Sequence, residues 1–532
     1  YCLEMLLFSY FLCYDSYRQQ ILEELGGFAM ISEKNIMKLQ NGSDVRGVAV
    51  EGVADEPVNL YPEAANRIAA GFVDFLSGQT GKKAKDLRIA VGHDSRISAD
   101  SLKQAVLKAL VGKGVTAVDC GLASTPAMFM SIVFDETKMD GSIMITASHL
   151  PYNRNGLKFF TADGGLEHED ILAVLEGAVR SPEFSADISG VEHFDLISLY
   201  ANHLCSKIRD GLGAEPDSQP LRGMHVVVDA GNGGGGFFAG KVLEVLGADT
   251  SGSVFLEPDG MFPNHIPNPE NKQAMAAIRK AVLSNKADLG LIFDTDVDRM
   301  SAVLPTGEEI SRNSLIAMMA AILAPAYPGS TIITDSITSD ELTVFLEKEL
   351  GLRHHRYMRG YKNVIDECIR LNKAGTVSPL AIETSGHGAL SENYYLDDGA
   401  YLAVKLLIAA AQAKQDGRAL GALVAKLGQP AEGKEYRMKI KGQEDFRGYG
   451  QKVLDAFGER AEKAGIEIAR PSYEGVRLIF ADGWALLRMS LHDPNMPLNI
   501  ESKHAGGCES IAAEVKKLLD GFDALDLSVF NK

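Results

Sequence analysis

The feature that most constrains this chain is a pair of strand patterns that occurs three times. A short β-branched run, a polar or glycine-rich turn and then a helical pattern are found at 87–96, 224–236 and 330–340. A second buried-type run follows each of them and ends in a loop of Ser, Thr, Asp, Glu or His, at 141–149, 287–298 and 378–387. Strand–turn–helix starts of this kind are typical of α/β units. The sequence therefore predicts one α/β domain used three times.

The position of the polar loops predicts where they meet. In open α/β sheets, ligands bind beyond the carboxyl ends of the strands. Because all three polar loops follow a predicted strand, we expect them to face one shared central cleft.

Gly/Pro/Ser-rich connectors at 211–223, 324–330 and 427–436 set the expected domain boundaries. They divide the chain into domain I (41–215), domain II (216–326), domain III (327–430) and domain IV (431–532). Domain IV has a different pattern, with a helix expected at about 447–464 and a hairpin at Asp482-Gly483, and is predicted to be α+β. Residues 1–40 begin with an apolar run shorter than the about 20 residues that span a bilayer and are set apart as an N-terminal extension.

Composition excludes several classes of protein. A chain of 532 residues with 46% hydrophobic and 23% charged residues is globular and holds several domains. A net charge of −18 argues against nucleic acid and anionic membrane as partners. The six cysteines are far apart, so neither a disulfide framework nor a zinc site is expected. We expect a monomer or homodimer in the cytoplasm, with the plastid stroma as the alternative.

The most informative loop is Asp294-Thr295-Asp296-Val297-Asp298-Arg299, called the acidic loop below. Three alternate carboxylates at a strand end would repel one another without a cation. Hard oxygen ligands favour Mg²⁺ over zinc, and so short a loop leaves coordination positions open for a phosphate oxygen. The alternatives are a calcium loop or a solvated acidic turn, although the longer EF-hand pattern ending in Glu is absent.

Ser148 is the candidate nucleophile, in a loop at 146–153 called the serine loop below. No GxSxG elbow surrounds it, which argues against an α/β-hydrolase. A Ser facing an Mg²⁺ site suits phosphoryl transfer, and His149 or Lys158 could carry the proton. The alternative is an ordinary helix N-cap.

The loop that ends the third repeat, 383–388, offers polar groups for a sugar. Glu383 and Ser385 project to the same side and could hydrogen-bond vicinal hydroxyls, although an ordinary polar turn is the alternative. Positive charge for an anionic substrate comes from Arg46, Arg96 and the stretch 359–362, each of which is by itself more typical of a surface. The run "GNGGGG" lacks the Lys-Ser/Thr of a P-loop and is interpreted as a tight turn into a helix.

Taken in order, these loops resemble the phosphoglucomutase/phosphomannomutase superfamily of α-D-phosphohexomutases, as a divergent branch. The motifs are "SDVRG", "VGHDSRIS", "TASHLP", "DTDVDR", "RGYKNVI" and "ETSGHG", over about residues 41–505. The resemblance implies Mg²⁺ held by Asp294, Asp296, Asp298 and a phosphoryl oxygen on Ser148, with Arg299 close to the metal. It implies glucose 1,6-bisphosphate as activator and hexose phosphates as substrates. It assigns catalysis to Ser148, Lys158, His149 and Arg46, and substrate binding to Arg96, Gly360, Tyr361, Lys362, Glu383, Ser385, His387, Arg488 and Ser490.

The chain departs from the family in the fourth domain, where it reads "RMSLHDPNMPLNIES". Relative to the family's phosphate clamp, His492 replaces Thr, Asp493 replaces Glu, and Pro497 replaces an Arg. Losing a guanidinium removes a bidentate phosphate contact, for which His492 or Lys503 would have to compensate.

Three functions follow from the resemblance. The first is a mutase that interconverts hexose 1-phosphate and hexose 6-phosphate, glucose before mannose. The second is a hexose-1,6-bisphosphate synthase, because a weak clamp lets the bisphosphate leave. The third is a sugar-phosphate sensor with little turnover, which would have no need to keep the acidic loop intact.

Overall fold

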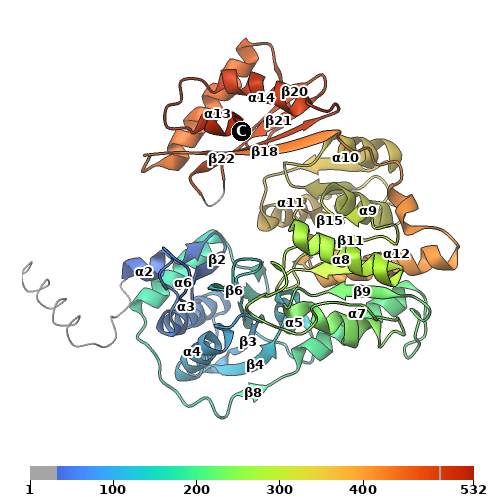
Figure 1. Cartoon of the computed structure of the whole chain (residues 1–532). Coiled ribbons are helices and arrows are strands. Elements are labelled where there is room, and N and C mark those ends of the chain that lie inside the picture. Colours follow the sequence, from blue (N-terminus) through green and yellow to red (C-terminus); the bar gives the residue numbers. More distant parts are fainter. Residues whose placement is uncertain (1–32, 491–492, 532) are drawn as a thin grey trace, which may run out of the picture.

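The computed structural model describes residues 33–490 and 493–531, and this part of the chain forms four β-sheets in succession (Figure 1). Each of the first three sheets combines parallel and antiparallel strands and packs against helices, whereas the fourth is antiparallel throughout. The predicted architecture of three α/β domains followed by an α+β domain is confirmed. Most of the N-terminal extension lies outside the described residues.

The first sheet has the strand order β1-β2-β6-β5-β3-β4-β8, with β7 paired to β6. Its parallel centre is β3 with β5 on one side and β4 on the other. The strands are β1 (Gln40–Asn41), β2 (Asp44–Val48), β3 (Arg88–His93), β4 (Thr116–Leu122), β5 (Gly141–Ile145), β6 (Arg154–Thr161), β7 (Gly164–Gly165) and β8 (Glu192–His193). The helices are α2 (Glu33–Met37), α3 (Pro62–Thr80), α4 (Ala99–Gly112), α5 (Thr125–Val133), α6 (His168–Arg180) and α7 (Leu196–Gly211).

The second and third sheets are smaller versions of the same plan. The second has the order β12-β11-β10-β9 and the third β14-β13-β15-β16-β17. Their strands are β9 (Val226–Asp229), β10 (Leu289–Phe293), β11 (Met300–Val303), β12 (Glu309–Ile310), β13 (Thr331–Thr334), β14 (Arg353–Arg356), β15 (Leu380–Ile382), β16 (Gly388–Leu390) and β17 (Leu396–Asp397). Their helices are α8 (Lys272–Asn285), α9 (Asn313–Leu323), α10 (Asp340–Val344), α11 (Tyr361–Lys373) and α12 (Gly399–Gln415).

The repeat seen in the sequence is a repeat of strand order. In each sheet the two strands of one predicted pair are neighbours and parallel: β3 with β5, β9 with β10, and β13 with β15. The second strand of each pair then turns back into an antiparallel neighbour, β6, β11 or β16. The serine loop, the acidic loop and the loop at 383–387 are these three reversals, so they occupy equivalent positions.

The fourth sheet has the order β18-β22-β21-β20-β19. Its strands are β18 (Glu432–Lys439), β19 (Glu467–Ile468), β20 (Val476–Phe480), β21 (Gly483–Leu487) and β22 (Asn495–Ser502), and its helices are α13 (Phe446–Lys463) and α14 (Gly507–Leu518). The predicted helix and hairpin are present. However, Phe480 pairs with Gly483, so the turn residues are Ala481 and Asp482 rather than the Asp-Gly dipeptide.

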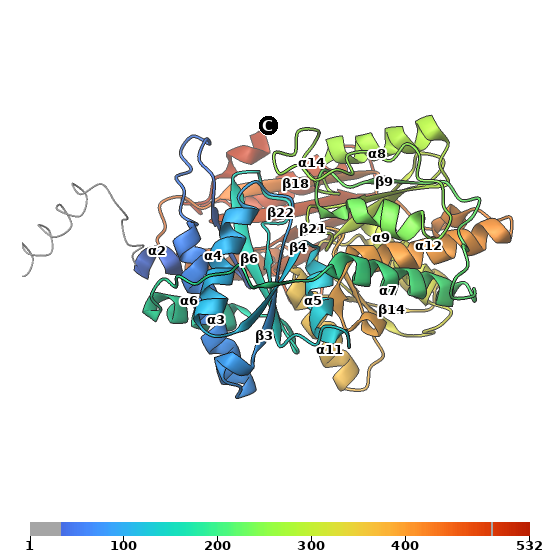
Figure 2. The same cartoon turned by 90° about the horizontal axis from the view of Figure 1, so that it is seen from below.

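One apolar core joins the first three sheets. A single cluster of buried side chains includes Ala90 of β3, Leu291 of β10, Ile332 of β13 and Leu407 of α12. Helix α7 contacts both α5 and α12 between these sheets (Figure 2). The fourth sheet has its own core with α13 and α14. Within the described residues, every helix is too short or too polar to cross a bilayer.

Candidate active site

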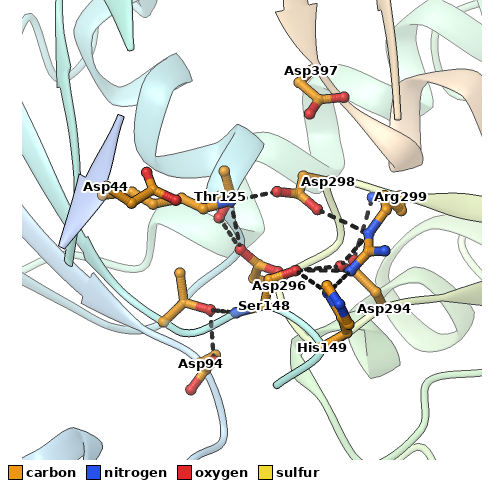
Figure 3. A network of polar contacts seen from close by, with 12 residues as sticks. Asp44, Asp94, Thr125, Ser148, His149, Asp294, Asp296, Asp298, Arg299 and Asp397 are labelled. Atoms are coloured by element: carbon orange, nitrogen blue, oxygen red, sulfur yellow. Dashed lines mark hydrogen bonds and ion pairs between the residues drawn. The ribbon is translucent and has the colours of Figure 1, made fainter. Parts of the chain in front are cut away.

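The serine loop begins where β5 ends and is held by a chain of short hydrogen bonds (Figure 3). The hydroxyl of Thr146 donates to Oδ2 of Asp94 at 2.7 Å, and the amide of Ser148 donates to that hydroxyl at 2.9 Å. Ser148 itself is buried and has a φ of +48°, which is uncommon for a residue other than glycine. Such strained backbone persists only where the surroundings fix it, and it is frequent at functional sites.

The side chain of Ser148 faces the acidic loop of the next domain. Its Oγ donates to Oδ2 of Asp294 at 3.1 Å and accepts from Nη2 of Arg299 at 2.9 Å. Arg299 in turn donates from Nε to Asp294 at 3.0 Å. The structure therefore brings the predicted nucleophile, one predicted metal ligand and the predicted neighbouring arginine into direct contact, although they are about 150 residues apart in sequence.

Backbone contacts from three domains hold the acidic loop. The carbonyls of Thr295, Asp296 and Val297 accept, in that order, from the amides of Gly234 (2.7 Å), Thr125 (2.8 Å) and Gly399 (3.1 Å). A Cβ on the last of these glycines would lie 2.6 Å from the backbone of Arg299, so only glycine allows this approach. Val297 has a φ of +67°, which is a true outlier for a β-branched residue.

Helix α5 positions the middle carboxylate. Its sequence Ser124-Thr125-Pro126 is an N-cap followed by a first turn that suits proline, and the Ser124 hydroxyl accepts from the amide of Ala127. This start directs the hydroxyl of Thr125 to Oδ2 of Asp296 at 2.5 Å. Thr125 was not predicted to be functional, and the only local signal for it is this helix-start pattern.

Lys158 neutralises part of the acidic loop, and Arg46 adds positive charge near it. Nζ of Lys158, on β6, lies 2.5 Å from Asp298 and 3.2 Å from Asp296. Burial alone would lower the pKa of Lys158, but these two carboxylates outweigh it and raise the pKa well above its ordinary value. Arg46, on β2, donates to Asp44 at 2.7 Å and to the carbonyl of Thr146 at 3.0 Å, so it also contacts the serine loop.

His149 is held in its neutral form. Burial, followed by the charges of Arg299 and Arg46, lowers the pKa of His149 to about 2. Its Nδ1 accepts a very short hydrogen bond from the guanidinium of Arg299 and lies 3.3 Å from Oγ of Ser148. A ring with so low a pKa is a poor base near neutral pH.

The carboxylates of Asp294, Asp296 and Asp298 are suited to hold a cation. Ligand oxygens from all three lie within 4.8 Å of one another. The Oδ1 atoms of Asp296 and Asp298 are buried and have no hydrogen-bond partner within 33–490 and 493–531. A buried carboxylate oxygen without a partner is costly, and an all-oxygen set is the kind that Mg²⁺ takes. The residues present therefore fit the predicted magnesium site.

The loop at 383–387 lies next to the acidic loop. His387 forms a backbone bridge with Arg299 and donates from Nδ1 to Asp397 at 2.5 Å. Although burial lowers the pKa of His387, Asp397 and Asp298 raise it to about 9. Its ring stacks on Tyr361, at 5.2 Å between centroids.

Glu383 accepts from the amide of Gly360 at 2.6 Å and lies 3.4 Å from the hydroxyl of Ser385. Burial and then Asp335 raise the pKa of Glu383 to about 7. Tyr361 reaches back to domain I, with its hydroxyl 3.3 Å from that of Ser43. Lys362 also contacts domain I, through Glu167 at 2.6 Å.

The geometry of Arg96 suggests a supporting role. All five of its side-chain N–H donors are used within the protein: Nε bonds Asp94, and the two terminal nitrogens bond the carbonyls of Ser148, Leu150, Pro151 and Arg154. Arg96 was predicted to bind substrate. In this conformation it fixes the backbone of the serine loop, and a contact with substrate stays a prediction.

The fourth domain contributes Arg488 and Ser490. Arg488 is buried, lies 3.6 Å from Glu474 and donates to the carbonyl of Met489 at 3.2 Å. The Ser490 hydroxyl accepts from the amide of Asp493 at 3.3 Å. Pro497 is buried in β22.

Of the two residues expected to compensate for the missing arginine, His492 lies outside the described residues. Lys503 follows the far end of β22, where its amide bonds the carbonyl of Asp482. It is therefore at the opposite end of the β21–β22 hairpin from Ser490.

Comparisons with known proteins match this chain at the level of its domains. Models of the α/β/α domains I, II and III of phosphoglucomutase/phosphomannomutase match residues 37–185, 200–307 and 311–429. A phosphomannomutase/phosphoglucomutase of Pseudomonas putida is 30% identical over 78% of this chain and 83% of its own. A phosphoglucomutase of Neisseria meningitidis is 28% identical over 90% and 95%. Among solved structures, a phosphoglucomutase/phosphomannomutase family protein from Burkholderia thailandensis has a TM-score of 0.74, with 25% identity over 93% of this chain and 98% of that one.

Proposed function

Because this chain belongs to the phosphoglucomutase/phosphomannomutase family of isomerases, we propose that it interconverts the 1-phosphate and 6-phosphate of a hexose, most favourably glucose. The reaction would pass through a phosphate on Ser148 and a hexose 1,6-bisphosphate. The observation that carries this proposal is the contact of the Ser148 hydroxyl with Asp294 and Arg299, beside carboxylate oxygens that have no hydrogen-bond partner among the described residues.

The first transfer moves a phosphoryl group from Oγ of Ser148 to the free hydroxyl of a hexose monophosphate. The bond from phosphorus to Oγ breaks and a bond to the sugar oxygen forms, while the sugar hydroxyl loses a proton and Oγ gains one. The second transfer returns the other phosphate of the bisphosphate to Ser148. We assign to Lys158 the proton that Oγ gains, because its ammonium group is already held at the acidic loop, and the amine that remains can then take the proton of the sugar hydroxyl. His149, with its low pKa, is the weaker base.

Asp294, Asp296 and Asp298 would hold Mg²⁺, which when bound neutralises charge on the phosphoryl oxygens. Around it the chain's own residues orient the reacting groups. Arg299 directs a hydrogen bond at Oγ of Ser148, and Arg46 and Arg96 fix the backbone that carries this serine. Glu383, Ser385 and His387 would hydrogen-bond the sugar.

Replacing Ser148 with Ala tests the proposal. We expect Ser148→Ala to lose mutase activity with glucose 1-phosphate by several orders of magnitude while it keeps the wild-type circular dichroism and melting temperature. Intact mass should show one phosphate on the wild type and none on the variant. The buried Ser142→Ala, whose hydroxyl bonds the carbonyl of Met128 outside the site, is the matched control and should stay active. An active Ser148→Ala enzyme would remove the proposed mechanism.

A bisphosphate synthase is the second candidate, and the fourth domain is the observation in its favour. The position that the family fills with an arginine is Pro497, buried in a strand, and Arg488 is engaged by Glu474. Adding trace glucose 1,6-bisphosphate to the assay separates the two functions. Sustained turnover at trace bisphosphate indicates a mutase. A synthase needs a second phosphoryl donor to recharge Ser148, so another bisphosphate is also supplied, and accumulation of hexose 1,6-bisphosphate at its expense indicates a synthase.

A further inference from the structure

We propose that the carboxylate of Glu474 occupies an anion-binding position between the third and fourth domains, and that the substrate's phosphate distal to Ser148 must displace it in order to bind. This inference rests on the proposed function for the identity of the anion. The anion position itself is inferred from contacts in the structure.

Three donors from two domains converge on Glu474. Its Oε2 accepts a very short hydrogen bond from the hydroxyl of Ser336 and a bond from the amide of Arg359 at 3.1 Å. Its Oε1 lies 3.6 Å from the guanidinium of Arg488. A hydroxyl, a backbone amide and a guanidinium around one group are the donors that proteins use to bind phosphate.

The position adjoins the sugar-facing loop. The amides of Arg359 and Gly360 are consecutive, and while the first bonds Glu474, the second bonds Glu383 at 2.6 Å. Gly360 has a φ of +112°, a backbone conformation that glycine adopts more readily than other residues. An anion in place of the Glu474 carboxylate would therefore sit one residue away from the group that we expect to hold the sugar.

The environment of Arg488 is a second observation in favour of an anion-binding position. The Arg488 side chain is only 5% exposed, and its Nε has no hydrogen-bond partner among the residues that the structure describes. A single carboxylate thus leaves part of this buried guanidinium unused. A phosphate has more acceptor oxygens than a carboxylate and could satisfy the guanidinium more fully.

The loop that carries Glu474 is anchored next to it. Tyr473 packs on Tyr357 and His355 of the third domain, with ring centroids 4.9 Å and 5.1 Å away. The carboxylate is therefore presented by a docked loop. The presence of the Glu474 carboxylate lowers the affinity of this position for the substrate phosphate, which favours release of phosphorylated products.

Calorimetric titration with inorganic phosphate, without Mg²⁺, tests the inference. Glu474→Gln keeps the shape but removes the charge, and we expect its dissociation constant to fall about tenfold, since hydrogen bonds to charged groups are among the stronger ones. Glu462→Gln, which removes an exposed charge paired with Arg470, is the matched control and should bind as the wild type does. The gain should disappear in Glu474→Gln/Arg488→Met. Equal or weaker binding by Glu474→Gln, or a gain that survives without Arg488, would overturn the inference.

Hydrogen exchange of the wild-type protein tests the same inference without the need for a folded variant. Saturating phosphate should increase hydrogen exchange in 472–475, because the displaced carboxylate no longer holds this loop, and unchanged or slower exchange would count against displacement. The probe contains no sugar and needs no turnover. If phosphate binding and hydrogen exchange change as expected but the enzyme has no mutase activity, the mutase proposal is refuted and the role of Glu474 is not. If the enzyme is an active mutase but phosphate binding and hydrogen exchange do not change as expected, only the role of Glu474 is refuted.

Discussion

Thr125 gives the sharpest test of how the acidic loop is built. Its hydroxyl is buried and donates to Oδ2 of Asp296 at 2.5 Å, while its amide bonds the carbonyl of the same residue. Thr125→Val has nearly the same volume and leaves the amide in place. The change removes one hydrogen bond to a charged group, worth about 1.5–3 kcal/mol.

Converted to binding, that energy corresponds to about a 10- to 100-fold change, which is the range expected when a partner of a metal ligand is lost. We therefore expect the Mg²⁺ concentration for half-maximal activity to rise by about 10- to 100-fold in Thr125→Val. Activity at saturating Mg²⁺ should remain close to the wild type, because Ser148 and Lys158 are untouched. Equilibrium titration with Mn²⁺ should show a weakening of similar size between Thr125→Val and the wild type, without turnover.

Thr137→Val is the matched control. This threonine is also buried and its hydroxyl bonds the carbonyl of Ser131 at 2.6 Å, far from the acidic loop. Both variants should lose stability in urea, but only Thr125→Val should change metal dependence. If the two variants have the same Mg²⁺ curve, the hydroxyl of Thr125 does not orient a metal ligand.

Two further predictions concern packing and titration. Gly71→Ala should destabilise the fold by about 1–3 kcal/mol in urea, because the new Cβ would lie 2.2 Å from the carbonyl of Val174 on α6. Gly78→Ala, on the same helix as Gly71, places its Cβ with nothing within 4 Å and should be neutral or stabilising. Equal effects of the two substitutions on stability would refute the close packing. Burial raises the pKa of Glu501 to about 7, and its carboxylate accepts from the indole of Trp484, the only tryptophan. Tryptophan fluorescence should therefore titrate with a midpoint near pH 7 and become flat in Glu501→Gln. Since this pKa lies above the ordinary 4.5, the contribution of Glu501 to the stability of the fold is complete below pH 4.5 and is lost as the pH rises through about 7. A wild-type fluorescence that does not change with pH would contradict the burial argument.

The sequence predicted the strand-end loops because strand periodicity and polar loop composition are local signals. Ser148 and Asp294 meet because equivalent reversals of neighbouring sheets face each other, which the repeat already implied. The residues that hold these loops were missed for a physical reason. Thr125 and Gly399 act on the acidic loop from other domains, and a single sequence contains no information about such distances.

Arg96 and Glu474 show the limits of reading charge from sequence. An arginine beside a predicted phosphate site suggests a substrate contact, yet every N–H donor of Arg96 is used on the protein itself. Glu474 lies in a connecting loop without a motif, and its position depends on how the fourth domain docks on the third. Only the arrangement of domains reveals either role.

Three consecutive carbonyls of the acidic loop each take an amide from a different domain, and one apolar core runs through those same three domains. Sliding any one of them against the others would break the loop that places the carboxylates. The rigid unit of this protein is thus larger than a domain. The fourth domain, by contrast, has a separate main core and docks on the third through polar and aromatic contacts and one small apolar cluster around Ile337 and Trp484, so any opening of this structure is expected there.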